Sequence, residues 1–238
     1  MINNKRIIAI IPARGGSKGL PGKNLRNIFG KPLIEWTIEK AKESQYLDTI
    51  LVTTDHMETA DISIKLGVEV PFIRPKELAD DYASTYDVIR HALEYYTKSE
   101  RKIFDYVVLL EPTSPLRDDG DIDTMLEMLI NHASEYDSIV SVGEISEHPA
   151  IVKRLDDSKI KSYCEELVQT TRRQDNTPAY FPYGVAYMAK TSILLKENTF
   201  YTRRCMSFKI KRYQNYEIDD IYDFLCVEKI MEYEWGTK

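Results

Sequence analysis

The sequence predicts an α/β doubly wound fold, in which helices cover both faces of a mostly parallel sheet. Two observations support this fold class. Apolar runs such as residues 7–11 are β-branched and lack polar alternation, as expected of strands buried on both faces. Up to about residue 142, such runs alternate with stretches whose apolar residues recur at helical spacing. With 238 residues, the chain suits one large domain, and we treat 1–238 as a single domain.

The strands are expected wherever a short apolar run is bounded by polar or turn-forming residues. In chain order these runs cover residues 7–11, 49–54, 106–110 and 138–142, and strand character returns at 184–188 and 206–210. Residues 68–73 are also rich in β-forming residues, so we expect them to be extended.

The helices are expected where apolar residues recur three and four positions apart. Such stretches cover residues 33–41, 57–66, 85–96, 122–130 and 221–233. The pattern is clearest in 122–130, where five apolar residues fall on one helical face. Pro32 suits a first helical turn, and Gly67 marks a helix end.

The alternation breaks between residues 144 and 182, which are polar, charged and aromatic with no clean period. Three structures are compatible with this segment: a lid, a small extension of the sheet, or a protruding dimerisation arm. The sequence alone leaves these alternatives open.

Composition excludes several classes of protein. Lys and Arg number 32 against 38 Asp and Glu, and the net charge of −6 argues against nucleic acid as a partner. The three cysteines form no CxxC pair, which fits neither a disulfide scaffold nor a zinc site. The early apolar run 7–11 is too short to span a membrane, and Pro12 and Arg14 follow it at once. We therefore expect a cytoplasmic protein without a membrane partner.

Glycine is concentrated in one place, because four of the ten glycines lie within residues 15–22. Glycines let backbone N–H groups approach an anion closely, and the neighbouring Arg14, Lys18 and Lys23 add positive charge. The segment is not a Walker loop, which requires glycine at Ser17 and a hydroxyl residue at Asn24. The pattern nevertheless indicates a loop that binds a nucleoside triphosphate.

Six separated motifs carry a family resemblance, at residues 13–24, 30–33, 51–55, 74–79, 112–117 and 217–219. In this order they resemble the acylneuraminate cytidylyltransferase family, the CMP-N-acetylneuraminic acid synthetases, over about residues 5–233. The resemblance implies a Rossmann-like nucleotidyltransferase that uses Mg²⁺, or alternatively Mn²⁺. In that family the hydroxyl of a sugar acid attacks the α-phosphate of CTP and pyrophosphate leaves. It also implies a homodimer, with residues 144–182 as its arm.

The same resemblance assigns roles to individual residues. The catalytic residues are expected to be Arg14, Lys23 and Asp219. The nucleotide is expected to contact Ala13, Arg14, Gly15, Ser17, Lys23, Asn24, Arg74, Ala83 and Thr85. Asp219 and Glu217 are expected to bind the metal, and their spacing of two places both carboxylates on one side of an extended segment. Asp55 either approaches the phosphates or caps the next helix.

The acceptor half of the site departs from the family pattern. Glu111 stands where sialate-specific members have glutamine, and Phe181 and Tyr183 precede residues 184–187 where those members have arginine and asparagine. These three residues and Arg173 are the expected sugar-acid contacts. The substitutions count against N-acetylneuraminate itself and favour another nonulosonate. Two alternatives stay open: a cytidylyltransferase for 3-deoxy-manno-octulosonate or another non-sialate acid, and a non-catalytic CTP-sensing module.

Overall fold

A computed structural model describes residues 2–165 and 176–236, and its largest sheet has six strands. The strands are β1 (Ile7–Pro12), β4 (Thr49–Thr53), β5 (Tyr106–Leu109), β6 (Ser138–Glu144), β9 (Tyr180–Lys190) and β10 (Cys205–Lys209). Their order across the sheet is β10-β6-β9-β5-β1-β4. The pairs β1–β4, β1–β5 and β6–β10 are parallel, whereas β9 runs antiparallel to both β5 and β6. The prediction of a mostly parallel sheet is confirmed.

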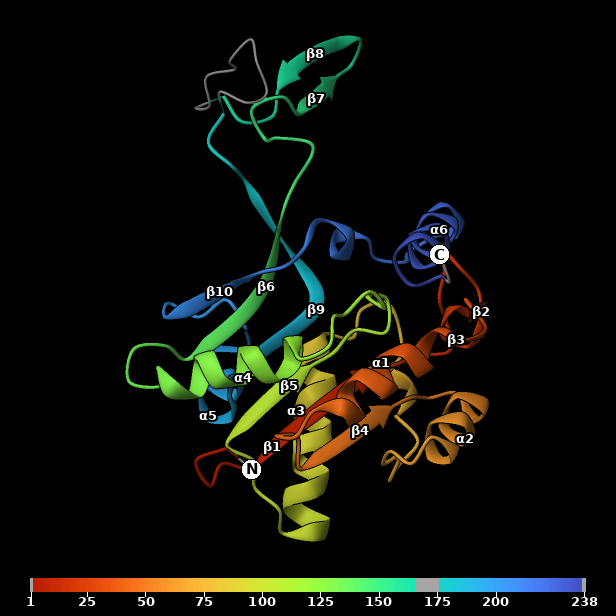
Figure 1. Cartoon of the computed structure of the whole chain (residues 1–238), viewed down its shortest axis with the longest axis vertical. Helices are drawn as coiled ribbons and strands as arrows, with labels where there is room; N and C mark the ends of the chain where they lie inside the picture. Colours follow the sequence, from red (N-terminus) through yellow and green to blue (C-terminus); the bar gives the residue numbers. More distant parts are fainter. Residues whose placement is uncertain (1, 166–175, 237–238) are drawn as a thin grey trace.

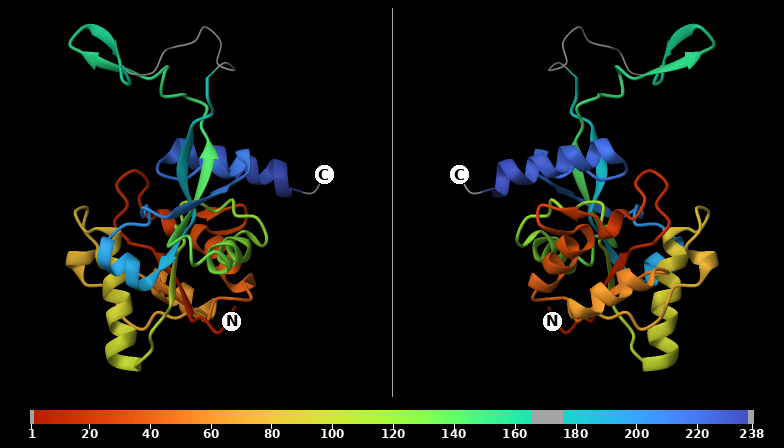
Figure 2. Two further views of the ribbon diagram at one scale, coloured as in Figure 1. Left: turned by 90° about the vertical axis from the view of Figure 1, so that its left-hand side faces the viewer. Right: turned by 90° about the vertical axis from the view of Figure 1, so that its right-hand side faces the viewer.

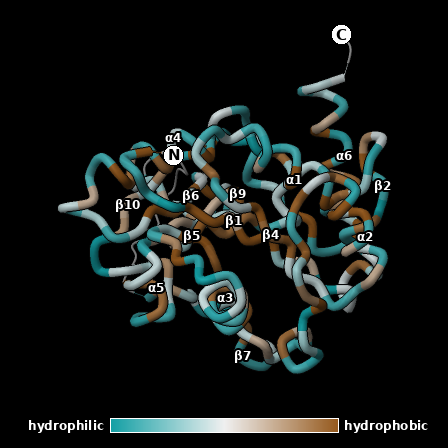
Figure 3. The backbone as a smooth tube through the Cα atoms, turned by 90° about the horizontal axis from the view of Figure 1, so that it is seen from below, coloured by the Kyte–Doolittle hydropathy of each residue, from teal (hydrophilic) through white to brown (hydrophobic). Residues whose placement is uncertain are grey.

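Helices cover both faces of this sheet. The helices of the described residues are α1 (Leu33–Glu43), α2 (Met57–Lys65), α3 (Thr85–Tyr95), α4 (Asp121–Asn131), α5 (Thr191–Glu197) and α6 (Ile221–Trp235), of which α6 packs in a separate cluster against residues such as Leu20, Ile28 and Leu116. Seen along the sheet, α1 and α4 lie on one side and α3 and α5 on the other, with the apolar strands between them (Figure 3).

The side chains of β1 explain this two-sided packing. Successive residues of a strand point to opposite faces. Ile7 and Ile11 accordingly pack in one buried cluster with residues of α1 and α4, whereas Ile8 and Ile10 pack in another with residues of α3 and α5. Because neither face of β1 meets water, its unbroken apolar run is the pattern the fold requires.

Residues 68–73 do not form the extended strand expected from their composition. Glu69 makes a single parallel bridge with Leu51 of β4, and no named strand includes it. Pro71 follows two residues later and has no N–H to donate, so the ladder cannot continue. The expectation was therefore wrong for most of this segment, since only Glu69 pairs with the sheet.

The segment between β6 and β9 projects from the main body. It contains β7 (Lys153–Asp156) and β8 (Lys159–Ser162), which pair as an antiparallel hairpin. Figure 1 shows this hairpin far from the sheet, at the opposite end of the molecule from the N-terminus, and Figure 2 shows the same from both sides. Leu155 and Ile160 on the hairpin are 80% and 70% exposed. The structure thus shows a protruding arm; its role in dimerisation stays a prediction.

The described residues also form short elements: η1 (Lys23–Leu25), β2 (Asn27–Ile28), β3 (Lys31–Pro32), η2 (Lys76–Leu78), η3 (Tyr96–Glu100) and η5 (Arg212–Asn215). Of these, η1 and η2 contribute residues to the crevice beyond the carboxyl ends of β1, β4 and β5. Within the described ranges, every helix is either too short or too polar to cross a lipid bilayer.

Candidate active site

A cavity of about 540 Å³ opens beyond the carboxyl ends of the central strands, where ligands bind in folds of this type. Seven of the nine residues predicted to contact the nucleotide line it: Arg14, Ser17, Lys23, Asn24, Arg74, Ala83 and Thr85. Glu111 and Asp219 also line it, so residues from both ends of the chain meet there.

The two remaining nucleotide residues, Ala13 and Gly15, anchor the glycine loop. Ala13 is fully buried, and its N–H donates to the Thr53 carbonyl at 3.0 Å. The N–H of Gly15 donates to Oδ1 of Asp55 at 2.9 Å. The helix α2 begins after His56 without a side-chain cap. Asp55 therefore holds the start of the glycine loop, a role the sequence did not suggest.

Gly19 lets the loop approach the segment that carries the predicted metal ligands. A Cβ at this position would lie 2.4 Å from the carbonyl oxygen of Asp219, closer than any side chain tolerates. On the same side, Nζ of Lys23 donates to the Ile218 carbonyl at 2.7 Å and pairs with Oδ1 of Asp219 at 3.1 Å. The side chain of Asn24 donates to the Arg14 carbonyl at 3.0 Å and is buried. The contacts of Lys23 thus join segments almost 200 residues apart in the sequence.

A carboxylate bridges the two outer cations of the loop. Oδ1 of Asp81 lies 3.0 Å from Nη1 of Arg14, and Oδ2 lies 2.5 Å from Nζ of Lys18. Hydrogen bonding from Lys18 lowers the pKa of Asp81, so this carboxylate is ionised at neutral pH. Because phosphate oxygens prefer the same partners, a bound triphosphate would compete with Asp81 for both cations.

Arg74 is 4% exposed and braces the opposite wall of the cavity. Its Nε donates to Oγ1 of Thr53 at 3.1 Å, and its Nη2 donates to the Thr53 carbonyl. Burial lowers the pKa of Arg74 to about 10, so the guanidinium stays charged at neutral pH. Ser84, between Ala83 and Thr85, caps α3 by accepting from the N–H of Asp87.

Two carboxyl groups meet around Gly184 in the acceptor half. Oε1 of Glu217 accepts from Oγ of Ser114 at 2.7 Å and from the N–H of Gly184. A Cβ on Gly184 would lie 2.5 Å from Oε2 of Glu111 and 2.8 Å from Oε1 of Glu217. Burial, and next the charge of Glu217, raise the pKa of Glu111 to about 7. Glu111 can therefore be neutral or ionised near neutral pH.

A smaller cavity of about 170 Å³ shares Thr85 and Glu111 with the first. Its aromatic wall consists of Tyr86, Tyr187, Phe200 and Tyr201. The sequence prediction missed Phe200 and Tyr201; the one signal was an adjacent aromatic pair in an otherwise polar stretch.

Two predicted acceptor contacts lie outside these cavities, and a third is not among the described residues. Phe181 and Tyr183 lie on β9 near the base of the arm, outside the linings of both cavities, and their rings pack at 5.1 Å. Arg173 lies outside the described residues. The roles of all three stay predictions.

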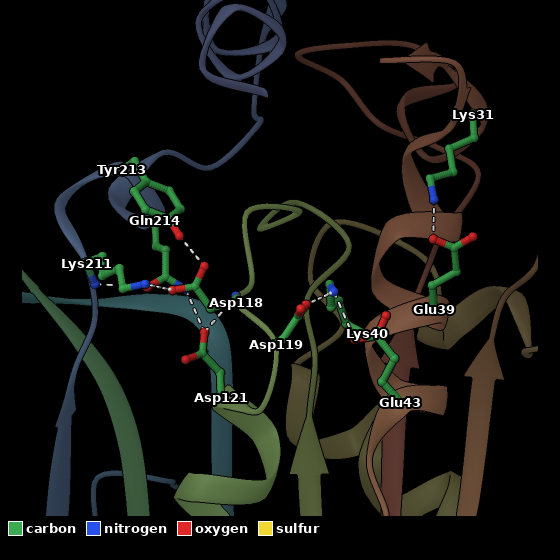
Figure 4. A network of polar contacts seen from close by, with 10 residues as sticks. All are labelled: Lys31, Glu39, Lys40, Glu43, Asp118, Asp119, Asp121, Lys211, Tyr213 and Gln214. Carbon is green, nitrogen blue, oxygen red and sulfur yellow. Dashed lines mark hydrogen bonds and ion pairs between the residues drawn. The ribbon is translucent and has the colours of Figure 1, made fainter. Parts of the chain in front are cut away.

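Polar contacts fix η5, the turn that leads into residues 217–219 (Figure 4). Asp118 pairs with Nζ of Lys211 at 2.7 Å and accepts from the hydroxyl of Tyr213. Oδ2 of Asp121 accepts from Nε2 of Gln214 at 2.6 Å. The loop after β5 and the start of α4 thereby set the position of Glu217 and Asp219.

The residues present fit the predicted Mg²⁺ site. Within residues 2–165 and 176–236, no cluster of three or more His, Cys, Asp or Glu residues forms a closed metal cage. Mg²⁺ at phosphate sites needs only one or two carboxylates, since substrate oxygens and waters complete its shell. Asp219 lines the cavity with its side chain 81% exposed, and the neighbouring Asp220 caps α6 in its place.

The sheet, the crevice at its carboxyl edge and the facing cations and carboxylates define a nucleotide-binding protein of the nucleotidyltransferase class. Comparison with known families makes this specific. The family model described as cytidylyltransferase matches residues 8–234, and the chain belongs to this family. The family membership inferred from the six motifs is confirmed.

Curated relatives differ in the sugar acid that their names give. The chain is 35% identical over 225 residues to the N-acylneuraminate cytidylyltransferase of Streptococcus agalactiae serotype III, covering 92% of this chain and 52% of that protein. It is 36% identical over 231 residues to the CMP-N,N'-diacetyllegionaminic acid synthase of Legionella pneumophila, covering 95% and 97%. The pseudaminic acid cytidylyltransferase of Campylobacter jejuni is 32% identical over 216 residues, covering 91% and 92%. The chain thus spans about half the length of the streptococcal relative.

A solved structure shares the fold. CMP:2-keto-3-deoxy-manno-octonic acid synthetase complexed with CTP superposes with a TM-score of 0.70, covering 96% of this chain and 99% of that chain at 18% identity. At this identity the likeness concerns the fold alone.

Proposed function

We propose that this protein transfers CMP from CTP to the hydroxyl of a nonulosonic acid, a sialic acid or a relative of one, and releases pyrophosphate. The observation that carries the proposal is the contact between the glycine loop and the segment 217–219, made by Lys23 and Asp219 at one cavity. Phosphoryl transfer needs a cation for the phosphates close to a carboxylate for a metal, and the proximity of Lys23 and Asp219 supports the proposal for that reason.

The triphosphate half would act mainly by positioning and by neutralising charge. Arg14 and Lys23 would hold the phosphates, while Ser17 and the loop amides donate hydrogen bonds. Asn24, Arg74, Ala83 and Thr85 would surround the nucleoside. Asp219, with Glu217 beside it, would hold Mg²⁺ or Mn²⁺, which supplies Lewis-acid stabilisation of the phosphate charge when bound.

The acceptor would lie in the smaller cavity, against Tyr187 and Phe200, with Glu111 between it and the nucleotide. The acceptor oxygen attacks the α-phosphorus as the bond to the pyrophosphate oxygen breaks. A carboxyl group here can accept from a hydroxyl or an amine of the sugar acid, and it must lie away from the acceptor's own carboxylate, which an ionised Glu111 would repel. Because all nonulosonates share that carboxylate, the preference for one other than N-acetylneuraminate rests on the change from glutamine to glutamate at this position, which alters the partner offered to the sugar's other polar groups.

We also propose that two copies associate through the arm. The exposed apolar side chains of β7 and β8 support this, since two-stranded hairpins are marginal without a partner.

A panel assay tests the proposed reaction. The protein is incubated with CTP, Mg²⁺ and one sugar acid at a time: N-acetylneuraminic, N,N'-diacetyllegionaminic, pseudaminic or 3-deoxy-manno-octulosonic acid. We expect release of pyrophosphate, fastest with a nonulosonate other than N-acetylneuraminate. Equal turnover of N-acetylneuraminate would refute the argument from Glu111. Tight CTP binding without turnover of any acid would favour the non-catalytic sensing module.

A further inference from the structure

Arg117 is a buried cation to which the proposed mechanism gives no part. It closes the motif 112–117, is 1% exposed, and makes no direct ion pair in the part of the chain that the structure describes. Burial lowers its pKa to about 10, so it is charged at neutral pH. Because an unpaired buried charge is costly, its surroundings must compensate it.

The compensation comes from five acceptors. Nε donates to the Val185 carbonyl at 2.6 Å. Nη1 donates to Oγ1 of Thr37 at 2.8 Å and to the Ser114 carbonyl at 2.6 Å. Nη2 donates to the carbonyls of Glu111 at 2.7 Å and Gly184 at 2.8 Å. All five N–H donors of the guanidinium are therefore used, across its own loop, β9 and α1.

Two of the residues that accept from Arg117 also hold Glu217. Ser114 and Gly184 each offer a carbonyl to Arg117 and a donor, Oγ or N–H, to Oε1 of Glu217. Glu111 offers its carbonyl to the same guanidinium. Arg117 thus connects the backbone on both sides of the carboxyl pair formed by Glu111 and Glu217.

The triphosphate half has separate supports. Arg14 contacts Asp81, Lys23 contacts Ile218 and Asp219, and Arg74 contacts Thr53. Within residues 2–165 and 176–236, the hydrogen bonds and ion pairs of these three cations involve neither Arg117 nor its acceptors. A substitution of Arg117 should therefore disturb the half of the site that contains Glu111 and Glu217 more than the triphosphate half.

We propose that Arg117 is a positioning residue that fixes Glu111 and Glu217 around Gly184, and so governs binding of the divalent metal and the sugar acid while leaving CTP affinity unchanged. The proposal rests on the function proposed above. Lysine cannot replace the guanidinium, because one ammonium nitrogen cannot reach five acceptors that surround a planar fork.

The test compares Arg117→Lys with Thr37→Val, which removes only the acceptor on α1. For each variant we would measure CTP affinity without metal by calorimetry, Mn²⁺ affinity in the presence of CTP by EPR, and KM for the fastest acid of the panel. For Arg117→Lys we expect Mn²⁺ dissociation constant and KM to rise about tenfold or more, with CTP affinity within about twofold of wild type. For Thr37→Val we expect all three to stay near wild type.

The proposal would be overturned if Arg117→Lys lost as much affinity for CTP as for Mn²⁺. It would also be overturned if the Mn²⁺ affinity of this variant were unchanged. If Arg117→Lys does not fold, Ser114→Ala replaces it, because this change removes a donor to Glu217 and keeps the carbonyl for Arg117. Ser114→Ala is then expected to weaken Mn²⁺ binding, and wild-type Mn²⁺ affinity would contradict the proposal. A wild-type protein that binds neither CTP nor any acid refutes the proposed function instead, and the Mn²⁺ titration without CTP still reports on Arg117.

Discussion

At the scale of residues, the site divides into a half built from cations and a half built from carboxyl groups. In the first half each cation of the glycine loop already has a carboxylate partner: Asp81 for Arg14 and Lys18, and Asp219 for Lys23. A triphosphate must replace or rearrange these pairs when it binds. Binding of the triphosphate would thus exchange protein carboxylates for phosphate oxygens as partners of these cations.

The first prediction concerns Asp81. Asp81→Asn removes the negative charge that competes with phosphate, so CTP should bind several-fold more tightly at low salt, and the gain should shrink as salt screens the loop. Calorimetry at two ionic strengths measures this. Asp119→Asn, which changes an exposed carboxylate paired with Lys40, is the matched control and should leave CTP affinity unchanged. Weaker CTP binding by Asp81→Asn would show that Asp81 supports the nucleotide.

The second prediction separates two neighbouring aspartates. Asp219→Ala should reduce pyrophosphate release by about a hundredfold or more, since it removes the carboxylate nearest the predicted metal. Asp220→Ala should instead lower the free energy of unfolding by about 1 kcal/mol, because Asp220 caps α6, and should leave turnover largely intact. Initial rates and chemical denaturation measure the two effects.

Arg14→Ala should likewise abolish turnover in a protein that stays folded. Full activity in either Arg14→Ala or Asp219→Ala would contradict the assignment of the site.

The third prediction follows from the raised pKa of Glu111, about 7 in the folded state against 4.5 unfolded. Below pH 4.5 Glu111 is protonated in both the folded and the unfolded protein, and its contribution to the free energy of unfolding is most favourable. As the pH rises from 4.5 to 7, the carboxyl ionises first in the unfolded protein, so that this contribution is lost. Glu111→Gln cannot ionise. It should match wild type near pH 4.5 and be more stable by about 1–3 kcal/mol at pH 8, without metal or nucleotide. Equal denaturation midpoints at pH 8 would mean that burial and the charge of Glu217 do not raise the pKa of Glu111 as inferred.

The sequence predicts those parts of the site whose residues are close together in the chain. Arg14 and Lys23 could be predicted because they lie within or beside one short glycine-rich segment, and such segments bind phosphates. The Asp81 bridge and the Glu111–Glu217 pair could not, because both depend on how separate loops pack. Asp55 was assigned to phosphates or a helix cap, yet its partner is the N–H of Gly15.

At the scale of elements, apolar periodicity located the main strands and helices within a few residues. It could not give the direction of β9, because the side-chain pattern of a strand is the same whether it runs parallel or antiparallel. It also could not show that residues 68–73 do not form a strand, because hydropathy carries no information on the backbone N–H that Pro71 lacks.

The fourth prediction concerns the arm. If it holds two copies together, Leu155→Asp combined with Ile160→Asp should convert a dimer into a monomer, because two charges would be buried at the interface. Ile103→Asp is the control, since Ile103 is also exposed, at 69%, but lies on the main body. Sedimentation velocity distinguishes the species. If the wild-type protein is a monomer, or if the doubly substituted protein is still a dimer, the proposal that two copies associate through the arm is wrong.

At the scale of the whole molecule, an acidic protein with a net charge of −6 carries three cations on one short glycine-rich loop that lines the crevice. Overall charge opposes binding of a polyanion such as nucleic acid, whereas Arg14, Lys18 and Lys23 give one loop the local charge that a nucleotide needs. The fold supplies the crevice, and the late segment 217–219 returns to it across the top of the sheet.

The central claim is transfer of CMP from CTP to a sugar acid, and ³¹P NMR of a single reaction tests it most directly. With CTP, Mg²⁺ and N,N'-diacetyllegionaminic or pseudaminic acid, we expect the three CTP signals to be replaced by one phosphodiester signal and one pyrophosphate signal of about twice its area, since the two products form in equimolar amounts and pyrophosphate holds two phosphorus atoms. Asp219→Ala should leave CTP intact under the same conditions. Pyrophosphate accompanied by free CMP, or CTP that persists with every acid of the panel, would contradict the account.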